Sequence, residues 1–169
     1  MDRSLVILID VWDSTCDPHV WSMIHRINKL EEEGKIEAAL FATYCAPIIR
    51  PKNGKYAYHP WMKSKLNVYC EELVPENYYM YDQDTNDYLN DIDGYNENVK
   101  NEILLLEKGF NFDNIIMMGG RWKECLHDRS LGIYNLKRVL PHKKIIIYPE
   151  CVCPLYNDYE KLKKGPFYV

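Results

Sequence analysis

The segment that most restricts the fold is an apolar run near the N-terminus, LVILI at 5–9, which ends at Asp10. The run is continuous rather than alternating, a pattern typical of a strand buried on both faces of a parallel sheet. Four later segments are also predicted to be strands: 36–44, 77–82, 114–120 and 143–150. Because helical patterns lie between them, we predict a three-layer α/β/α sandwich with a mainly parallel sheet of about five or six strands.

Apolar residues at helical spacing separate the predicted strands. Asp17 and Pro18 suit the cap and the first position of a helix that follows the first strand. A second stripe from Val99 ends near Gly109, and a third follows Cys125 as one helix that reaches to about residue 140. No linker or internal repeat interrupts the chain, so we predict a single domain over 1–169.

The charge and the cysteine distribution restrict the partners and the compartment. The net charge of −4 comes without a broad basic patch, so we expect no nucleic-acid partner. No apolar run approaches the ~20 residues of a membrane span. Six cysteines are scattered along the chain rather than arranged in a dense disulfide framework, which favours a reduced, cytoplasmic setting. We therefore expect a cytoplasmic protein that takes a small-molecule substrate or ligand and needs no cofactor.

Reactive side chains follow the predicted strands at their carboxyl ends, where open parallel sheets form their sites. These side chains are Asp10, Cys45, Asp82, Cys125, Cys151 and Cys153. The segment 46–65 has several prolines and no clear periodicity. Its length predicts a functional loop or lid beside such a site.

Cys125 stands at a corner of the sequence GGRWKEC, residues 119–125. Gly119 and Gly120 permit a tight turn with the backbone close to a ligand. A helix that begins near Trp122 would bring free amides and a positive dipole end to the thiol, which favours the reactive thiolate and could hold an oxyanion. The alternative is a small buried residue where helix meets sheet. Asp10 is likewise either a general base or a helix cap.

Three segments together carry a resemblance: LVILIDVWDS, IIMMGGRWKECLHDRSLGIYNLKR and KKIIIYPE. They resemble the isochorismatase-like cysteine hydrolases over nearly the whole chain, and the resemblance implies a Rossmann-like fold and a homo-oligomer. It also implies that Cys125 is the nucleophile and Asp10 the general base. Trp12 stands where that family usually has glutamine.

The sequence departs from that family at two positions. The family places a catalytic lysine at the end of its third strand, where this chain has Tyr81 and Asp82. A carboxylate there would raise the pKa of a neighbouring thiol. Lysines of the 46–65 loop are possible substitutes, although no pattern selects one. The metal-binding members carry a pair of histidines after the second strand, and only His59 occurs here, so we expect no metal site.

Three side chains near the predicted crevice are candidates for substrate contact. Trp12 and Trp122 could stack on a planar substrate, and Arg121 could hold a carboxylate through two hydrogen bonds. For each of them, ordinary packing or a surface position is the competing interpretation.

Two functions remain open on the sequence. The first is a cysteine hydrolase of a small amide or related substrate, and the second is a degenerate member of the same fold that binds a ligand or a protein. A metal or redox site of several cysteines is disfavoured, because the C-x-C spacing of Cys151 and Cys153 is not typical of metal ligands. A haloacid-dehalogenase-type phosphatase fails on spacing, because Asp13 follows Asp10 by three residues rather than two.

Overall fold

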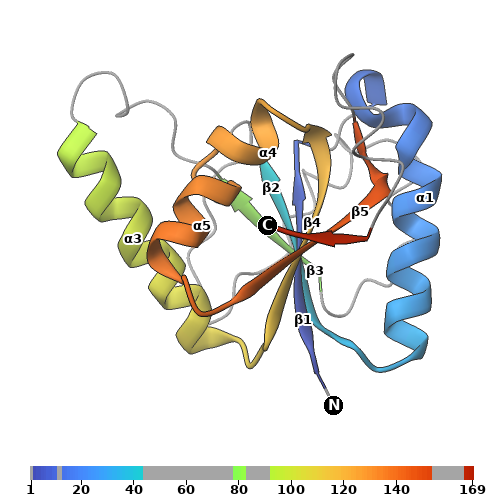
Figure 1. The fold of residues 1–169 in the computed structure, drawn as a ribbon, viewed down its shortest axis with the longest axis horizontal. Helices are drawn as coiled ribbons and strands as arrows, with labels where there is room; N and C mark the ends of the chain where they lie inside the picture. Colours follow the sequence, from blue (N-terminus) through green and yellow to red (C-terminus); the bar gives the residue numbers. More distant parts are fainter. Residues whose placement is uncertain (1, 11–12, 44–77, 83–91, 154–165) are drawn as a thin grey trace.

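The computed structural model describes residues 2–10, 13–43, 78–82, 92–153 and 166–169 (Figure 1). Its strands are β1 (Ser4–Ile9), β2 (Ile36–Thr43), β3 (Tyr78–Asp82), β4 (Asn114–Arg121), β5 (Lys144–Cys153) and β6 (Phe167–Tyr168). Its helices are α1 (Asp13–Glu32), α3 (Ile92–Gly109), α4 (Cys125–Asp128) and α5 (Ile133–Val139).

The strands form one six-stranded sheet in the order β3-β2-β1-β4-β5-β6. Neighbouring strands from β3 to β5 pair in parallel, and β6 pairs antiparallel with β5. The predicted sheet is therefore confirmed, with β1 at its centre. β5 runs further than the sequence predicted: Cys151 and Cys153 are buried within the strand instead of following it. The pairing of β5 with β4 continues to Cys153, with register shifts after Met117.

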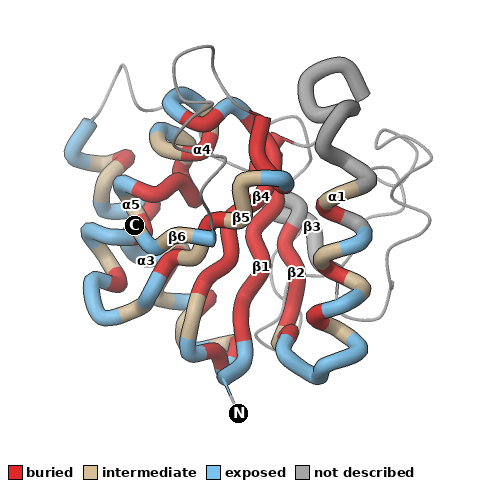
Figure 2. The backbone as a smooth tube through the Cα atoms, turned by 45° about the vertical axis from the view of Figure 1, so that its right-hand side comes forward, coloured by how far each residue is buried: buried red, intermediate tan, exposed pale blue. Residues whose placement is uncertain are grey.

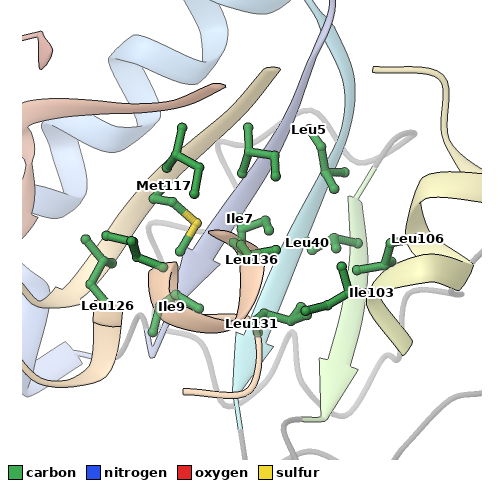
Figure 3. Close-up of a cluster of buried hydrophobic side chains, with 14 of the residues drawn as sticks. Leu5, Ile7, Ile9, Leu40, Ile103, Leu106, Met117, Leu126, Leu131 and Leu136 are labelled. Atoms are coloured by element: carbon green, nitrogen blue, oxygen red, sulfur yellow. The ribbon is translucent and has the colours of Figure 1, made fainter. Parts of the chain in front are cut away.

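Helices cover both faces of the sheet, which confirms the three layers (Figure 1). Leu5, Ile7 and Ile9 belong to one buried cluster that also contains residues of α3 and α5 (Figure 3). Since successive side chains of a strand point to opposite faces, Val6 and Leu8 lie on the α1 side. All of β1 is buried, and Figure 2 shows the buried strands at the centre of the molecule. The continuous apolar run of β1 thus follows from its burial on both faces.

Two helices begin and end close to their sequence signals. α3 buries Tyr95, Val99, Ile103 and Leu106 and ends at Gly109, as its apolar stripe predicted. α1 begins at Asp13, one turn before the predicted start at Asp17. The segment Asp13-Ser14-Thr15 is itself typical of a helix N-terminus, so the sequence held two start signals and the first one is used.

The helix predicted after Cys125 is two helices, and the prediction of a single one was wrong. Arg129 ends α4 with an extended backbone, at φ −64 and ψ 162. The chain then turns before α5. A Cβ on Gly132 would lie 2.6 Å from the carbonyl oxygen of His127 and 2.8 Å from that of Arg129, so only glycine fits this turn. Apolar residues recur at helical spacing on both sides of the turn, so the sequence pattern gave no sign that the helix is interrupted.

None of the described helices is long and apolar enough to cross a membrane.

Candidate active site

The site lies where the strand order reverses, between β1 and β4. From β1 one crossover leads to β2 on one side, and the later part of the chain continues through β4 on the other. A crevice forms beyond the carboxyl ends of the strands at such a point. Asp10 follows β1 directly, and Cys125 follows the end of β4 by four residues, at the start of α4. Two residues that the sequence proposed for chemistry therefore meet at the sheet's central crevice.

Asp10 is held in an unusual backbone conformation. Its φ is 46°, which makes it the one described residue other than glycine with a positive φ. This left-handed region costs most residues about 1–2 kcal/mol, although aspartate and asparagine tolerate it better. The side chain is 2% exposed and the amide donates a hydrogen bond to the Ala42 carbonyl. A strained, buried carboxylate at a strand end is typical of a functional position.

The glycine pair before Cys125 makes room for the cysteine rather than for a ligand. Gly119 has a φ of 98°, which favours glycine. A Cβ on Gly120 would lie 2.9 Å from the Cβ of Cys125 and 3.1 Å from the carbonyl oxygen of Ile9. The end of β4 can therefore approach both Cys125 and the end of β1 closely, and this brings the thiol beside Asp10.

We expect Gly120→Ala to displace Cys125 and to lower the free energy of unfolding by about 1–3 kcal/mol, because the added methyl overpacks this contact. Chemical denaturation measures the stability, and the alkylation rate of Cys125 reports the displacement. Unchanged values for both would show that the backbone around Gly120 relaxes freely, and the close contact would then have no role in placing the thiol.

Burial and the neighbouring carboxylate set the protonation state of Cys125. Burial raises the pKa of the thiol, and the charge of Asp10 raises it further; a backbone hydrogen bond from Arg121 and the charge of Arg129 lower it. The expectation that the helix start would favour the thiolate was therefore wrong. α4 is only four residues long, so its dipole is small beside the effects of burial and Asp10.

The same environment makes Asp10 a stronger base. Burial raises the pKa of its carboxyl, while the charge of Arg129 and hydrogen bonds with Arg129 and Cys125 oppose that rise. The two groups lie close together, because the guanidinium of Arg129 contacts both of them. A protonated thiol thus lies against a buried carboxylate, which is the starting arrangement for proton transfer from sulfur to oxygen.

Arg129 is the site residue that the sequence analysis did not identify. Its Nε donates a 2.6 Å hydrogen bond to Oδ2 of Asp10, and the two side chains are 23% and 2% exposed. Its Nη2 lies 3.8 Å from the sulfur of Cys125. The spacing of four residues between Cys125 and Arg129 was a usable signal, because residues four apart share one face of a helical turn.

A pocket of about 810 Å³ opens beside Cys125, between the start of α3 and the α4–α5 segment. Its described lining residues are Ile92, Tyr95, Asn96, Glu124, Cys125, Asp128, Arg129, Ser130, Tyr134 and Asn135. The volume suits a small organic molecule. Most of the lining side chains are polar, so a ligand would meet hydrogen-bonding groups next to the thiol.

Ser130 contributes a buried hydroxyl to this pocket. It is 1% exposed, and its Oγ has no hydrogen bond in the part of the chain that the structure describes. An unsatisfied buried polar group costs about 1–3 kcal/mol. We therefore expect Ser130→Ala to increase the free energy of unfolding by about 1 kcal/mol, as measured by urea denaturation. A loss of stability of similar size would show that the hydroxyl is bonded in solution.

Two of the three residues predicted for substrate contact, Arg121 and Trp122, are not among the described lining residues of the pocket. Trp122 is 2% exposed and packs edge-to-face against His127 and Phe167, within the core cluster rather than the pocket lining. Arg121 is exposed and pairs with Glu124 at 3.5 Å. Trp12 and the 46–65 loop lie outside the described residues, as does Cys45.

The structure describes part of the disfavoured cysteine site and the end of the third strand, where the family has its lysine. Cys151 donates a hydrogen bond to the Ser22 carbonyl in the packing between β5 and α1, and burial raises the pKa of its thiol. No group of three or more metal-ligating side chains forms among the described residues. Asp82 ends β3 opposite Thr43, so β2 separates it from β1.

Comparison with known proteins adds one similar structure. No protein-family model matches the chain, and no curated protein matches it in sequence. The chain is similar to the crystal structure of N-carbamoylsarcosine amidase from Thermoplasma acidophilum, with 13% identity and a TM-score of 0.49. The similarity covers 95% of this chain and 90% of that chain. The chemistry of the site follows from its own residues.

Proposed function

We propose that the chain is a cysteine hydrolase of the isochorismatase-like type, which cleaves a small amide or related compound. The observation that carries this proposal is the placement of Cys125, which lines a pocket large enough for a small molecule, beside the buried carboxylate of Asp10, with one guanidinium, that of Arg129, in contact with both groups. A nucleophile bonded to a base is the recurring arrangement of covalent catalysis.

In the proposed reaction, the sulfur of Cys125 attacks the substrate carbonyl carbon while the thiol proton moves to Asp10. The C–N bond then breaks, and Asp10 returns the proton to the leaving nitrogen. Water attacks the resulting thioester with Asp10 as the base again, which releases the acid and restores the thiol. The amides of His127 and Asp128 donate to the Glu124 carbonyl. The first two amides of α4, those of Cys125 and Leu126, are therefore the ones we propose for the carbonyl oxygen as it gains charge.

The direction of the pKa shifts fits this order of events. Burial raises the pKa of the Cys125 thiol, so the resting thiol carries its proton until a substrate arrives. Burial also raises the pKa of Asp10, and a carboxylate of higher pKa accepts that proton more readily. Deprotonation and attack would then occur together, without a stored thiolate.

The charges of the pocket favour a neutral or cationic substrate. Among the described lining residues, Asp128 contributes a carboxylate and Glu124 contributes a second one that pairs with Arg121 at 3.5 Å, whereas the cation of Arg129 is engaged by Asp10. We expect the carboxylate of Asp128 to disfavour a substrate that carries a carboxylate of its own. A panel of test compounds should therefore contain small neutral amides, ureas and amides that bear an amino group, with anionic amides for comparison.

Trapping of a covalent intermediate tests the proposal. The protein is mixed with the panel of amides and their more reactive ester analogues, quenched in acid within seconds and analysed by intact-mass spectrometry and peptide mapping. We expect an acyl adduct on Cys125 that decays with release of the acid product. Cys151→Ala is the matched control, because it removes a buried thiol that is not among the described lining residues of the pocket and should leave the adduct unchanged.

The competing function is a degenerate member of the fold that only binds its ligand. Compounds that raise the melting temperature but leave no adduct on Cys125, with no release of acid over hours, would support that function and refute the hydrolase.

A further inference from the structure

Arg129 contacts both groups between which the proposed reaction moves a proton. Nε lies 2.6 Å from Oδ2 of Asp10, and Nη2 lies 3.8 Å from the sulfur of Cys125, within the range of an N–H···S hydrogen bond. One guanidinium thus spans the proton acceptor and the proton donor. The steps proposed for Cys125 and Asp10 assign no role to this cation.

The fold fixes the backbone of Arg129 at this point. Its N–H donates to the Cys125 carbonyl at 3.2 Å, which ties it to the nucleophile through one turn of chain. Its carbonyl accepts from the Gly132 amide at 2.7 Å and from Nδ2 of Asn135 at 3.2 Å. Asn135 and the turn that ends α4 therefore hold the backbone of Arg129, and the hydrogen bond from Nε to Asp10 holds its guanidinium.

The position matters because negative charge moves during the reaction. Before attack the charge is on the Asp10 carboxylate, and as the thiol proton transfers, the charge passes to sulfur. A cation that contacts only one of these groups would favour one state and resist the change. A cation that contacts both attracts the charge in either place, so the site need not reorganise while the proton moves.

The chemistry of arginine adds a second consequence. A guanidinium keeps its charge throughout the accessible pH range, because its pKa is above ~12. Arg129 can therefore hold charge but cannot deliver a proton to the leaving group. The proton that leaves the thiol has to remain with Asp10 until the leaving nitrogen takes it.

We propose that Arg129 is the third catalytic residue of this site, a fixed cation that stabilises negative charge on both Asp10 and the sulfur of Cys125 during proton transfer. The inference rests on the proposed hydrolase function for its role in turnover. Its effect on the thiol itself can be measured without any substrate.

The test compares Arg129→Gln, Arg129→Lys and Arg129→Ala with the unaltered protein. Arg26→Gln is the matched control, because Arg26 also donates a 2.6 Å hydrogen bond to a carboxylate, that of Glu150, but belongs to α1. The rate of Cys125 alkylation by iodoacetamide is followed against pH by peptide mapping, which gives the pKa of the thiol. Loss of the cation from Arg129→Gln should raise that pKa by about one unit or more. Alkylation at pH ~8 should then slow about tenfold, while Arg26→Gln should behave like the unaltered protein.

The variants Arg129→Ala and Arg129→Lys keep the test valid if Arg129→Gln does not fold. Guanidinium ion added to Arg129→Ala, well below denaturing concentration, should restore part of the alkylation rate. Arg129→Lys keeps the charge, but its single ammonium cannot contact Asp10 and the sulfur of Cys125 together as the planar guanidinium does. Turnover of any substrate should therefore fall about tenfold or more.

The outcomes separate this inference from the proposed function. An unchanged thiol pKa in folded Arg129→Gln, or full turnover in Arg129→Lys, would overturn the role of Arg129 and leave the hydrolase proposal standing. A protein that forms no acyl adduct but shows the expected pKa shift in Arg129→Gln would refute the hydrolase and retain the electrostatic coupling of Arg129 to the thiol.

Discussion

Cys125→Ala should lower the turnover of any amide that the protein hydrolyses by at least about 10⁴-fold, since loss of a covalent nucleophile removes the main route of the reaction. Alanine keeps the Cβ that contacts Gly120, so the variant should fold normally. Initial rates of acid release, measured with substrate in excess, give the comparison. The melting temperature should change by no more than a few degrees.

Cys151→Ala is again the matched control for this prediction. Its sulfur is buried between β5 and α1, and its removal should affect stability slightly and turnover very little. Residual activity of Cys125→Ala within tenfold of the unaltered protein would contradict the account, because another group would then perform the attack.

Asp10→Asn should have opposite effects on turnover and on thiol reactivity. Turnover should fall about 10²–10⁴-fold, the usual effect of removing a general base. Alkylation of Cys125 at pH ~8 should accelerate, because the negative charge of Asp10 raises the pKa of the thiol and asparagine lacks that charge. Asparagine also tolerates the left-handed backbone at this position, so the variant should keep its local structure.

The buried Cys151 provides an internal control for Asp10→Asn. If the variant unfolded, Cys151 would become alkylated together with Cys125, whereas in a folded variant only Cys125 accelerates. Faster turnover, or slower alkylation of Cys125 in a folded variant, would show that Asp10 is not the base. In the unaltered protein, turnover should also decline in acid at a pH above the ordinary pKa of aspartate, ~3.9, because burial raises the pKa of Asp10.

The sequence predicted the sheet because burial on both faces leaves a continuous apolar run, such as that of β1. The strand-end rule then located Asp10 and Cys125 correctly, since topology alone decides that the ends of β1 and β4 meet. That prediction needed no knowledge of side-chain contacts.

The electrostatics of the site could not be predicted in the same way. The predicted helix dipole assumed one long helix after Cys125, but the turn at Gly132 depends on backbone contacts with His127 and Arg129 that no local pattern reveals. The sequence suggested lysines of the 46–65 loop as the cation, whereas in the structure Arg129, which follows α4, forms the ion pair with Asp10.

The most direct test of the account is the pH dependence of Cys125 alkylation, measured by peptide mapping in the unaltered protein and in Asp10→Asn, with Cys125→Ser as the blank. We predict that the pKa of the Cys125 thiol lies above the ~8.5 of a free cysteine in the unaltered protein and is clearly lower in Asp10→Asn. Equal pKa values in the two proteins would contradict it, because Cys125 and Asp10 would then not be coupled and could not exchange a proton during catalysis.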